Sequence, residues 1–163
     1  MSPFTESTAQ VNPELITSLG DELYQALKAC RTLEPLTNRH AGITIDDAYA
    51  IQQRMMKRRL DAGERVVGKK IGVTSKAVMD MLGVYQPDFG WLTDAMLYNE
   101  GEAIRASTLI QPKAEGEIAF MLKSDLHGPG VTREDVLAAT AWVAPCFEIV
   151  DSRIDDWKIR IQD

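Results

Sequence analysis

The amino-acid sequence predicts an α+β fold, in which a helical N-terminal segment is followed by a strand-rich region. Leucines recur at spacing four near the N-terminus, which is typical of one helix face. After Arg65, short apolar runs are separated by glycines and prolines, a pattern typical of strands and turns. This order favours an α+β fold, and 163 residues suit one domain or one modest core with a helical attachment.

We expect the N-terminal helical segment to span 1–64 and the β-rich region to span 65–163. Within the first segment, residues 1–12 form a loose leader. Pro13 opens the first helix, because proline is well tolerated at a first helical position. The apolar face of that helix consists of Leu15, Leu19, Leu23 and Leu27.

A connector over 31–42 separates this helix from a second one. Thr44 is the expected N-cap of the second helix, with Asp47 three residues later, and Gly63 ends it. The two helices form an N-terminal layer.

The β-rich region contains strands, short helices and turns. The expected strands cover 66–73, 114–122 and 143–150, with short extended pieces at 91–97, 103–104 and 109–110. Short helices are expected from Ser75 and after Thr132, where hydroxyl side chains can cap a helix. Near the C-terminal end, alternating apolar residues at 157–161 indicate a strand or a docking segment that is cut off at residue 163.

The charge and the apolar pattern exclude several classes of partner. Lys and Arg total 18 against 24 Asp and Glu, a net charge of −6, whereas a nucleic-acid binder needs a basic stripe. An acidic protein can still bind a small anion at a locally positive site. No stretch is long enough to cross a membrane, so we expect a cytoplasmic protein without membrane or nucleic-acid partners. Cys30 and Cys146 fit no metal or redox spacing, and Cys146 is expected to be buried.

Three glutamates are candidates for a metal site. Glu115 and Glu117 alternate in a strand, so their carboxylates share one face about 6–7 Å apart. A solvated strand face is the ordinary interpretation of such a pair. Glu148, however, interrupts an apolar run, where a carboxylate is costly unless it alternates to solvent or has a cation partner. If the strands are neighbours, three carboxylates converge and need a cation. Oxygen ligands favour Mg²⁺ or Mn²⁺, while the histidines and cysteines do not suit zinc.

Lys70 is a further candidate. Gly68 and Gly72 flank it and let a ligand approach the backbone beside its ammonium group. The ordinary interpretation is a surface lysine next to Lys69, which in a strand must face the opposite side. For Asp88, which follows a proline, the residues alone indicate only turn chemistry.

Four motifs occur in order along the chain. They are GKKIGVTS at 68–75, QPDFG at 86–90, QPKAEGEIA at 111–119 and PCFEIVDSR at 145–153. Together they resemble the hydratase/decarboxylase branch of the fumarylacetoacetate hydrolase superfamily, and most of all its 2-hydroxypenta-2,4-dienoate hydratases (2-oxopent-4-enoate hydratases) of aromatic meta-cleavage pathways. The resemblance extends from about Leu15 onward.

The resemblance implies a mixed, rolled β-sheet core and a site for Mg²⁺ or Mn²⁺ formed by Glu115, Glu117 and Glu148. It also implies that Lys70 faces the substrate and that Asp88 is an acid/base partner. The implied reaction is metal-assisted ketonisation of 2-hydroxypenta-2,4-dienoate, followed by addition of water at C4 to give 4-hydroxy-2-oxopentanoate.

Two alternatives remain open. One is decarboxylation of 2-oxo-3-hexenedioate (4-oxalocrotonate), although the loop 83–90 is more similar to the hydratase version. The other is an inactive fragment that only binds a pathway partner. The partners that the resemblance implies are a small 2-oxo or 2-hydroxy dienoate, further copies in a homo-oligomer, and the decarboxylase of the pathway. Members of the family continue beyond the point at which this chain stops, so we expect a C-terminal truncation that leaves apolar surface exposed.

Overall fold

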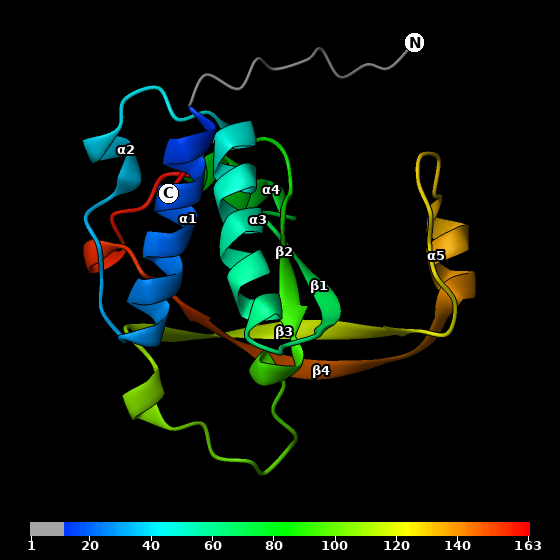
Figure 1. The fold of residues 1–163 in the computed structure, drawn as a ribbon. Coiled ribbons are helices and arrows are strands. Elements are labelled where there is room, and N and C mark those ends of the chain that lie inside the picture. The colour runs from blue at the N-terminus through cyan, green and yellow to red at the C-terminus, as the bar shows by residue number, and fades with distance from the viewer. Residues whose placement is uncertain (1–11) are drawn as a thin grey trace. The chain divides into compact units, whose positions relative to one another are not determined.

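The computed structural model describes residues 12–163, except for the side chains of residues 81 and 82. Three helices come first, and a strand-rich region with two short α-helices follows, so the predicted α+β fold is confirmed (Figure 1). The helices are α1 (Pro13–Lys28), α2 (Leu36–Arg39), α3 (Ile45–Asp61), α4 (Lys76–Leu82) and α5 (Arg133–Ala139). The strands are β1 (Val66–Gly72), β2 (Asp88–Thr93), β3 (Pro112–Leu122) and β4 (Thr140–Asp151). Apart from Asn12, the predicted leader lies outside the described residues.

The starts of α1 and α3 are fixed by capping side chains. Asn12 Oδ1 accepts a hydrogen bond from the Glu14 N–H at 2.9 Å, and Pro13 occupies the first turn. At α3, the Thr44 hydroxyl accepts from the Asp47 N–H at 3.2 Å, and the Asp47 carboxylate accepts from the Thr44 N–H at 2.9 Å. Each cap contributes about 1 kcal/mol. Both helix starts agree with the sequence prediction.

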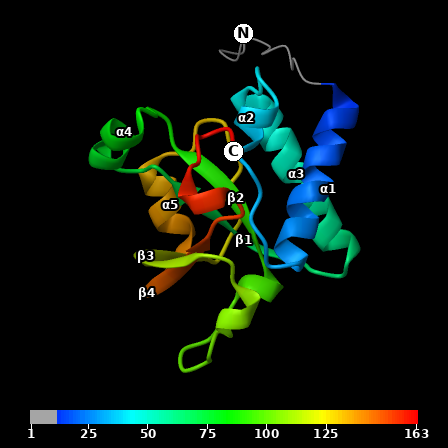
Figure 2. The ribbon, with the colours of Figure 1, turned by 90° about the vertical axis from the view of Figure 1, so that its left-hand side faces the viewer.

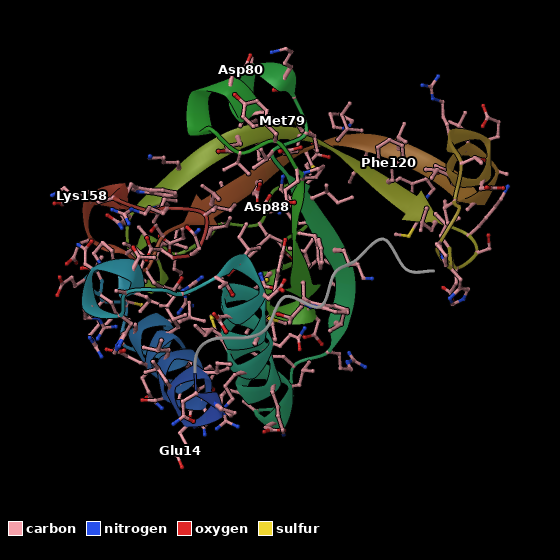
Figure 3. The ribbon with its side chains drawn as sticks, turned by 90° about the horizontal axis from the view of Figure 1, so that it is seen from above. Glu14, Met79, Asp80, Asp88, Phe120 and Lys158 are labelled. Carbon is pink, nitrogen blue, oxygen red and sulfur yellow. The ribbon has the colours of Figure 1, made fainter. Side chains whose placement is uncertain are left out.

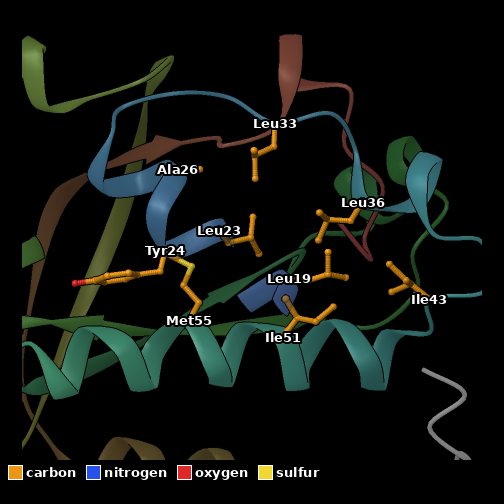
Figure 4. Packing of buried hydrophobic residues seen from close by; sticks show 9 residues of the cluster. All are labelled: Leu19, Leu23, Tyr24, Ala26, Leu33, Leu36, Ile43, Ile51 and Met55. Atoms are coloured by element: carbon orange, nitrogen blue, oxygen red, sulfur yellow. The ribbon is translucent and has the colours of Figure 1, made fainter. Parts of the chain in front are cut away.

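The hydrophobic core lies between α1 and α3, which are side by side in both views (Figures 1 and 2). Gly20 of α1 allows close contact, because a Cβ there would lie 2.5 Å from Cγ of Arg54 on α3. Arg54 Nε in turn donates to Asp21 Oδ1 at 2.7 Å. Figure 4 shows the buried cluster: Leu19, Leu23, Tyr24, Ala26, Leu33, Leu36, Ile43, Ile51 and Met55. Each fully buried aliphatic side chain contributes about 1.5–3 kcal/mol relative to exposure.

The described strands form two separate two-stranded antiparallel sheets, β1 with β2 and β3 with β4. The resemblance implies a mixed, rolled sheet, of which the described residues form these two antiparallel strand pairs, the β1–β2 hairpin and the β3–β4 hairpin. The piece expected at 91–97 divides into the end of β2 and the 3-10 turn η1 (Asp94–Met96). The pieces expected at 103–104 and 109–110 are not strands and flank a second 3-10 turn, η2 (Ala106–Thr108).

The strand predicted at 157–161 is wrong. A 3-10 turn, η3 (Asp155–Trp157), ends at the first residue of this stretch, and no strand follows it up to residue 163. The backbone φ is positive at Asp156 (53°) and Trp157 (58°), which interrupts an extended chain. Just before this turn, Ile154 pairs with Leu33 in an isolated parallel bridge.

The chain divides into two compact units. One comprises Met1–Ile110 with Ser152–Asp163, and the other comprises 111–151. The boundary expected at residue 65 falls between α3 and β1, inside the first of these units, where β2 packs on α3. The rings of Tyr49 and Phe89 stack with centroids 4.8 Å apart. Among the described residues, no helix has both the length and the apolar character needed to cross a membrane.

Candidate metal centre

The second unit consists of the β3–β4 hairpin and α5. The two long strands pair antiparallel from Pro112↔Asp151 to the end near Leu122↔Thr140. At the open end of the hairpin, the Gln111 N–H donates to Asp151 Oδ1 at 2.7 Å. At the connection, Thr132 and Asp135 form the capping box of α5, as the sequence predicted.

The register of this hairpin places the three candidate glutamates on one face. Glu115 lies directly opposite Glu148, and Glu117 lies opposite Cys146, so Glu117 is the diagonal neighbour of Glu148. Each glutamate offers one carboxylate oxygen, and these oxygens all lie within 4.8 Å of one another. Glu115 is exposed, whereas Glu117 and Glu148 are half-buried. The convergence predicted from alternation and from the apolar setting of Glu148 is therefore present in the structure.

The chemistry of this face fits a divalent cation. Like charges directly opposite each other destabilise a strand pair, so a cation shared by Glu115 and Glu148 would turn repulsion into attraction. One oxygen from each of three carboxylates leaves coordination positions for water or a ligand, as Mg²⁺ and Mn²⁺ prefer. Among the described residues, these three glutamates form the group of histidine, cysteine or acidic side chains whose ligand atoms lie close enough together to share one ion.

The opposite face of the same hairpin is apolar and open to solvent. Phe147 is 80% exposed and Ile118 is 64% exposed. Phe120 and Val143 lie opposite each other on this face, and both are exposed (Figure 3 labels Phe120). Cys146, on the glutamate face, is also exposed, so the prediction of a buried thiol is wrong. An apolar run indicates a strand but does not reveal whether anything covers it.

The other candidate residues lie on the β1–β2 hairpin of the first unit. Lys70 pairs with Gly90 and Lys69 pairs with Trp91, so the two lysines face opposite sides of the hairpin. The Lys69 ammonium lies over the Trp91 ring at 4.9 Å from its centroid, which accounts for its orientation. Lys70 is half-buried, whereas Lys69 is exposed.

Asp88 begins β2 and pairs with Gly72 of β1 (Figure 3 labels Asp88). Because Gly72 and Lys70 are two residues apart in one strand, Asp88 lies on the same face as Lys70, as its diagonal neighbour. One face of this hairpin therefore carries a cation and a carboxylate, each opposite a glycine. Sequence reasoning placed Asp88 in a turn and did not anticipate this cross-strand relation.

A buried polar network holds the base of the β1–β2 hairpin against α3. The Arg59 side chain is buried, and its Nε donates to Glu64 Oε2 at 2.8 Å. Its Nη2 donates to Thr93 Oγ1 at 3.2 Å, and the Thr93 hydroxyl donates to Glu64 Oε2 at 2.6 Å. No pattern in the sequence was interpreted as this network. The available signal was the spacing of four from Ile51 through Met55 to Arg59, which places Arg59 on the buried face of α3.

A surface contact closes the same hairpin. The Arg65 N–H donates to Asp94 Oδ1 at 3.0 Å, and the Arg65 guanidinium donates to Oδ2 at 3.1 Å. The hydrogen bond from the Arg65 backbone has the larger effect and the one from its guanidinium the smaller, and both lower the pKa of Asp94 from its ordinary value of 3.8.

Comparison with known proteins gives close relatives, although no protein-family model matches the chain. The chain is 66% identical over 152 residues to 2-hydroxyhexa-2,4-dienoate hydratase of Comamonas testosteroni, covering 92% of this chain and 58% of the relative. It is 69% identical over 150 residues to 2-hydroxypent-2,4-dienoate hydratase of Pseudomonas putida, covering 91% of this chain and 68% of the relative. The chain thus spans about three fifths to two thirds of these curated relatives.

A solved structure has the same fold. The 4-oxalocrotonate decarboxylase from Pseudomonas putida G7, complexed with magnesium and adipate, superposes with a TM-score of 0.90 at 34% sequence identity. The match covers 95% of this chain and 59% of that one. A second structure of that decarboxylase, complexed with calcium and acetate, matches with a TM-score of 0.86.

Proposed function

The chain belongs to the family of 2-hydroxypenta-2,4-dienoate hydratases, in the hydratase/decarboxylase branch of the fumarylacetoacetate hydrolase superfamily, and from this premise we propose that it catalyses the family's metal-assisted hydration. The reaction converts 2-hydroxypenta-2,4-dienoate and water into 4-hydroxy-2-oxopentanoate. The observation that carries the proposal is the convergence of Glu115, Glu117 and Glu148, whose oxygens lie within 4.8 Å of one another on the β3–β4 hairpin.

In this proposal the three glutamates hold one divalent cation, Mg²⁺ or Mn²⁺. The crystallised decarboxylase neighbour holds magnesium in one structure and calcium in another, which supports an oxygen-ligated divalent ion. When bound, such an ion supplies Lewis-acid polarisation of the 2-oxygen and the carboxylate of the substrate. The three glutamates and a divalent ion together carry a charge near −1.

Lys70 is proposed to act on the substrate. A lysine ammonium can donate hydrogen bonds to the negative charge that develops on an anionic substrate during the reaction. The support is its half-buried setting opposite Gly90, where no side chain occupies the facing position. Lys69, on the other face and over Trp91, does not share this setting.

Asp88 is proposed to move protons. A carboxylate can take a proton from the attacking water or pass one to the terminal carbon during ketonisation. Its support is the shared face with Lys70, at diagonal positions of the β1–β2 hairpin. A cation and a carboxylate on one face suit a reaction that adds a proton and a hydroxyl group to the same substrate.

The decisive experiment measures turnover of the purified chain with 2-hydroxypenta-2,4-dienoate. After EDTA treatment, activity should be absent, and it should return on addition of Mg²⁺ or Mn²⁺ in the native chain but not in Glu115→Gln. The product should be 4-hydroxy-2-oxopentanoate. A folded chain that binds a pathway protein stoichiometrically and never turns over substrate would refute the proposal and support the inactive-fragment alternative.

Decarboxylation is a second candidate, favoured by the structural match to 4-oxalocrotonate decarboxylase. The two chemistries share the metal and the electron sink but differ in whether water is added. Sequence identity of 66% and 69% to hydratases, against 34% to the decarboxylase, favours hydration. Release of CO₂ from 2-oxo-3-hexenedioate faster than hydration of the dienoate would reverse this order.

The proposal also includes assembly into a homo-oligomer and binding to the decarboxylase of the same pathway, in the cytoplasm. Support comes from the exposed apolar face of the β3–β4 hairpin, because large apolar surfaces often mark protein contacts. Light scattering of the purified chain, alone and mixed with the decarboxylase, tests both. A monomer in the first measurement would refute the homo-oligomer, and a mixture without any species larger than the separate proteins would refute the complex.

A further inference from the structure

Asp88 lies against a backbone position that has no side chain. In the β1–β2 register it is directly opposite Gly72. A Cβ built on Gly72 would overlap Oδ1 of Asp88 and would lie 3.3 Å from its Cγ. Since real Cβ atoms do not approach other atoms that closely, any residue larger than glycine at 72 requires the Asp88 carboxylate to move.

The backbone itself does not demand glycine at this position. Gly72 is absent from the glycines of positive φ, namely Gly42, Gly63, Gly83, Gly101 and Gly130, so an L-residue could adopt its conformation. The absence of a side chain at Gly72 therefore matters because the Asp88 carboxylate occupies the space that a Cβ would fill.

Other glycines of the same hairpin differ in this respect. A Cβ on Gly68 would meet only Cδ1 of Leu92 at 3.8 Å, which is ordinary van der Waals contact. A Cβ on Gly90 would meet only Nε2 of Gln52, also at 3.8 Å. Neither substitution would disturb a charged group.

From this geometry we infer that Gly72 is a positioning residue, whose missing side chain seats the Asp88 carboxylate on the face that carries Lys70. The inference rests on the proposed function, in which Asp88 moves protons. Without the space above Gly72, the carboxylate would be displaced along or away from the hairpin, while Asp88 would remain present and ionisable. Gly72 thus acts on the reaction only through Asp88.

A double-mutant cycle between Gly72 and Asp88, measured by turnover, tests this dependence. Gly72→Ala should lower kcat about 10-fold or more and change KM less than about 2-fold, because a reacting group misplaced by about 1 Å loses rate on this scale. In Asp88→Ala, which has already lost the carboxylate, adding Gly72→Ala should lower kcat no further. An equal fractional loss in both backgrounds would overturn the inference, because Gly72 would then act independently of Asp88.

Thermal unfolding tests the geometry without relying on turnover. Replacing a glycine by alanine at a compatible backbone position normally stabilises, so the control Gly68→Ala should raise Tm by about 2 °C. Gly72→Ala should do the same in the Asp88→Ala background but should raise Tm less, or lower it, when Asp88 is present, because the carboxylate must then move. An equal rise in Tm in both backgrounds would refute the seating of the carboxylate. Normal turnover of Asp88→Ala would instead refute the proposed role of Asp88, and a difference in Tm between the two backgrounds would then still establish the contact.

Discussion

Replacing Glu115 by glutamine should have opposite effects on stability with and without metal. The oxygens of Glu115, Glu117 and Glu148 lie within 4.8 Å of one another. At that separation two unit charges in water repel by about 1 kcal/mol. Glu115 is exposed, so the value for water applies, and its two repulsive pairs are weakened further by salt. Without metal, Glu115→Gln should therefore stabilise the chain by about 1 kcal/mol, or roughly 2–4 °C in Tm.

With metal, the order should invert. A ligand at 100 times its Kd stabilises the native state by about 2.7 kcal/mol, and this gain requires the full set of carboxylates. The native chain should therefore gain several degrees in Tm on addition of Mg²⁺ or Mn²⁺, and Glu115→Gln should gain much less. The assay is thermal unfolding after EDTA treatment and again after metal addition, with calorimetric titration of the metal. Glu100→Gln, an exposed glutamate outside the cluster, serves as the control.

Two results would refute this reasoning. If Glu115→Gln is less stable than the native chain in EDTA, the three carboxylates do not repel one another as their spacing requires. If metal raises Tm equally in both proteins, Glu115 is not part of the binding site.

Further predictions concern the other unit. Lys70→Met should lower kcat about 10²-fold with metal affinity unchanged or slightly raised, whereas Lys69→Met should retain near-normal kcat; steady-state kinetics with metal titration checks both, and the reverse order would show that the faces are misassigned. Arg59→Ala should destabilise the chain by about 3 kcal/mol, because it leaves buried acceptors without their donor. By contrast, Lys57→Ala, at an exposed ion pair, should cost about 0.5 kcal/mol or less in urea unfolding. The pKa of Asp94 is lowered from 3.8, so its stabilising effect is fully present above that pH and is lost as the pH falls through the lower folded-state value; Asp94→Asn should therefore reduce the slope of stability against pH in acid.

Local signals in the sequence were sufficient to predict α1, α3, α4 and α5, whereas α2 lies within 31–42, which was expected to be a connector. Capping depends on residues three apart, so Thr44 with Asp47 and Thr132 with Asp135 could be recognised without knowledge of the fold. The prediction of a strand at 157–161 was wrong because an alternating apolar pattern does not reveal backbone dihedral angles, and Trp157 adopts a positive φ.

The candidate site was only partly accessible from the sequence. Alternation within one strand was enough to place Glu115 and Glu117 on a common face. The position of Glu148 depends on register between strands distant in sequence, which spacing alone does not determine. The relation of Asp88 to Gly72 is likewise non-local, so it emerged only from strand pairing.

The bridge between Leu33 and Ile154 has a consequence for how the metal face keeps its alignment. Ile154 follows shortly after β4, and both residues of the bridge belong to the first unit. The chain therefore enters the β3–β4 hairpin from the first unit and returns to the same unit after it, so both ends of the hairpin are fixed. A one-residue slip between β3 and β4 would turn Glu148 away from Glu115. Tethered ends also reduce the loop-closure entropy lost when the strands pair. Slippage is further opposed by the hydrogen bond from the Gln111 N–H, just before β3, to Asp151 Oδ1 at the end of β4, which favours the register that brings the three carboxylates together.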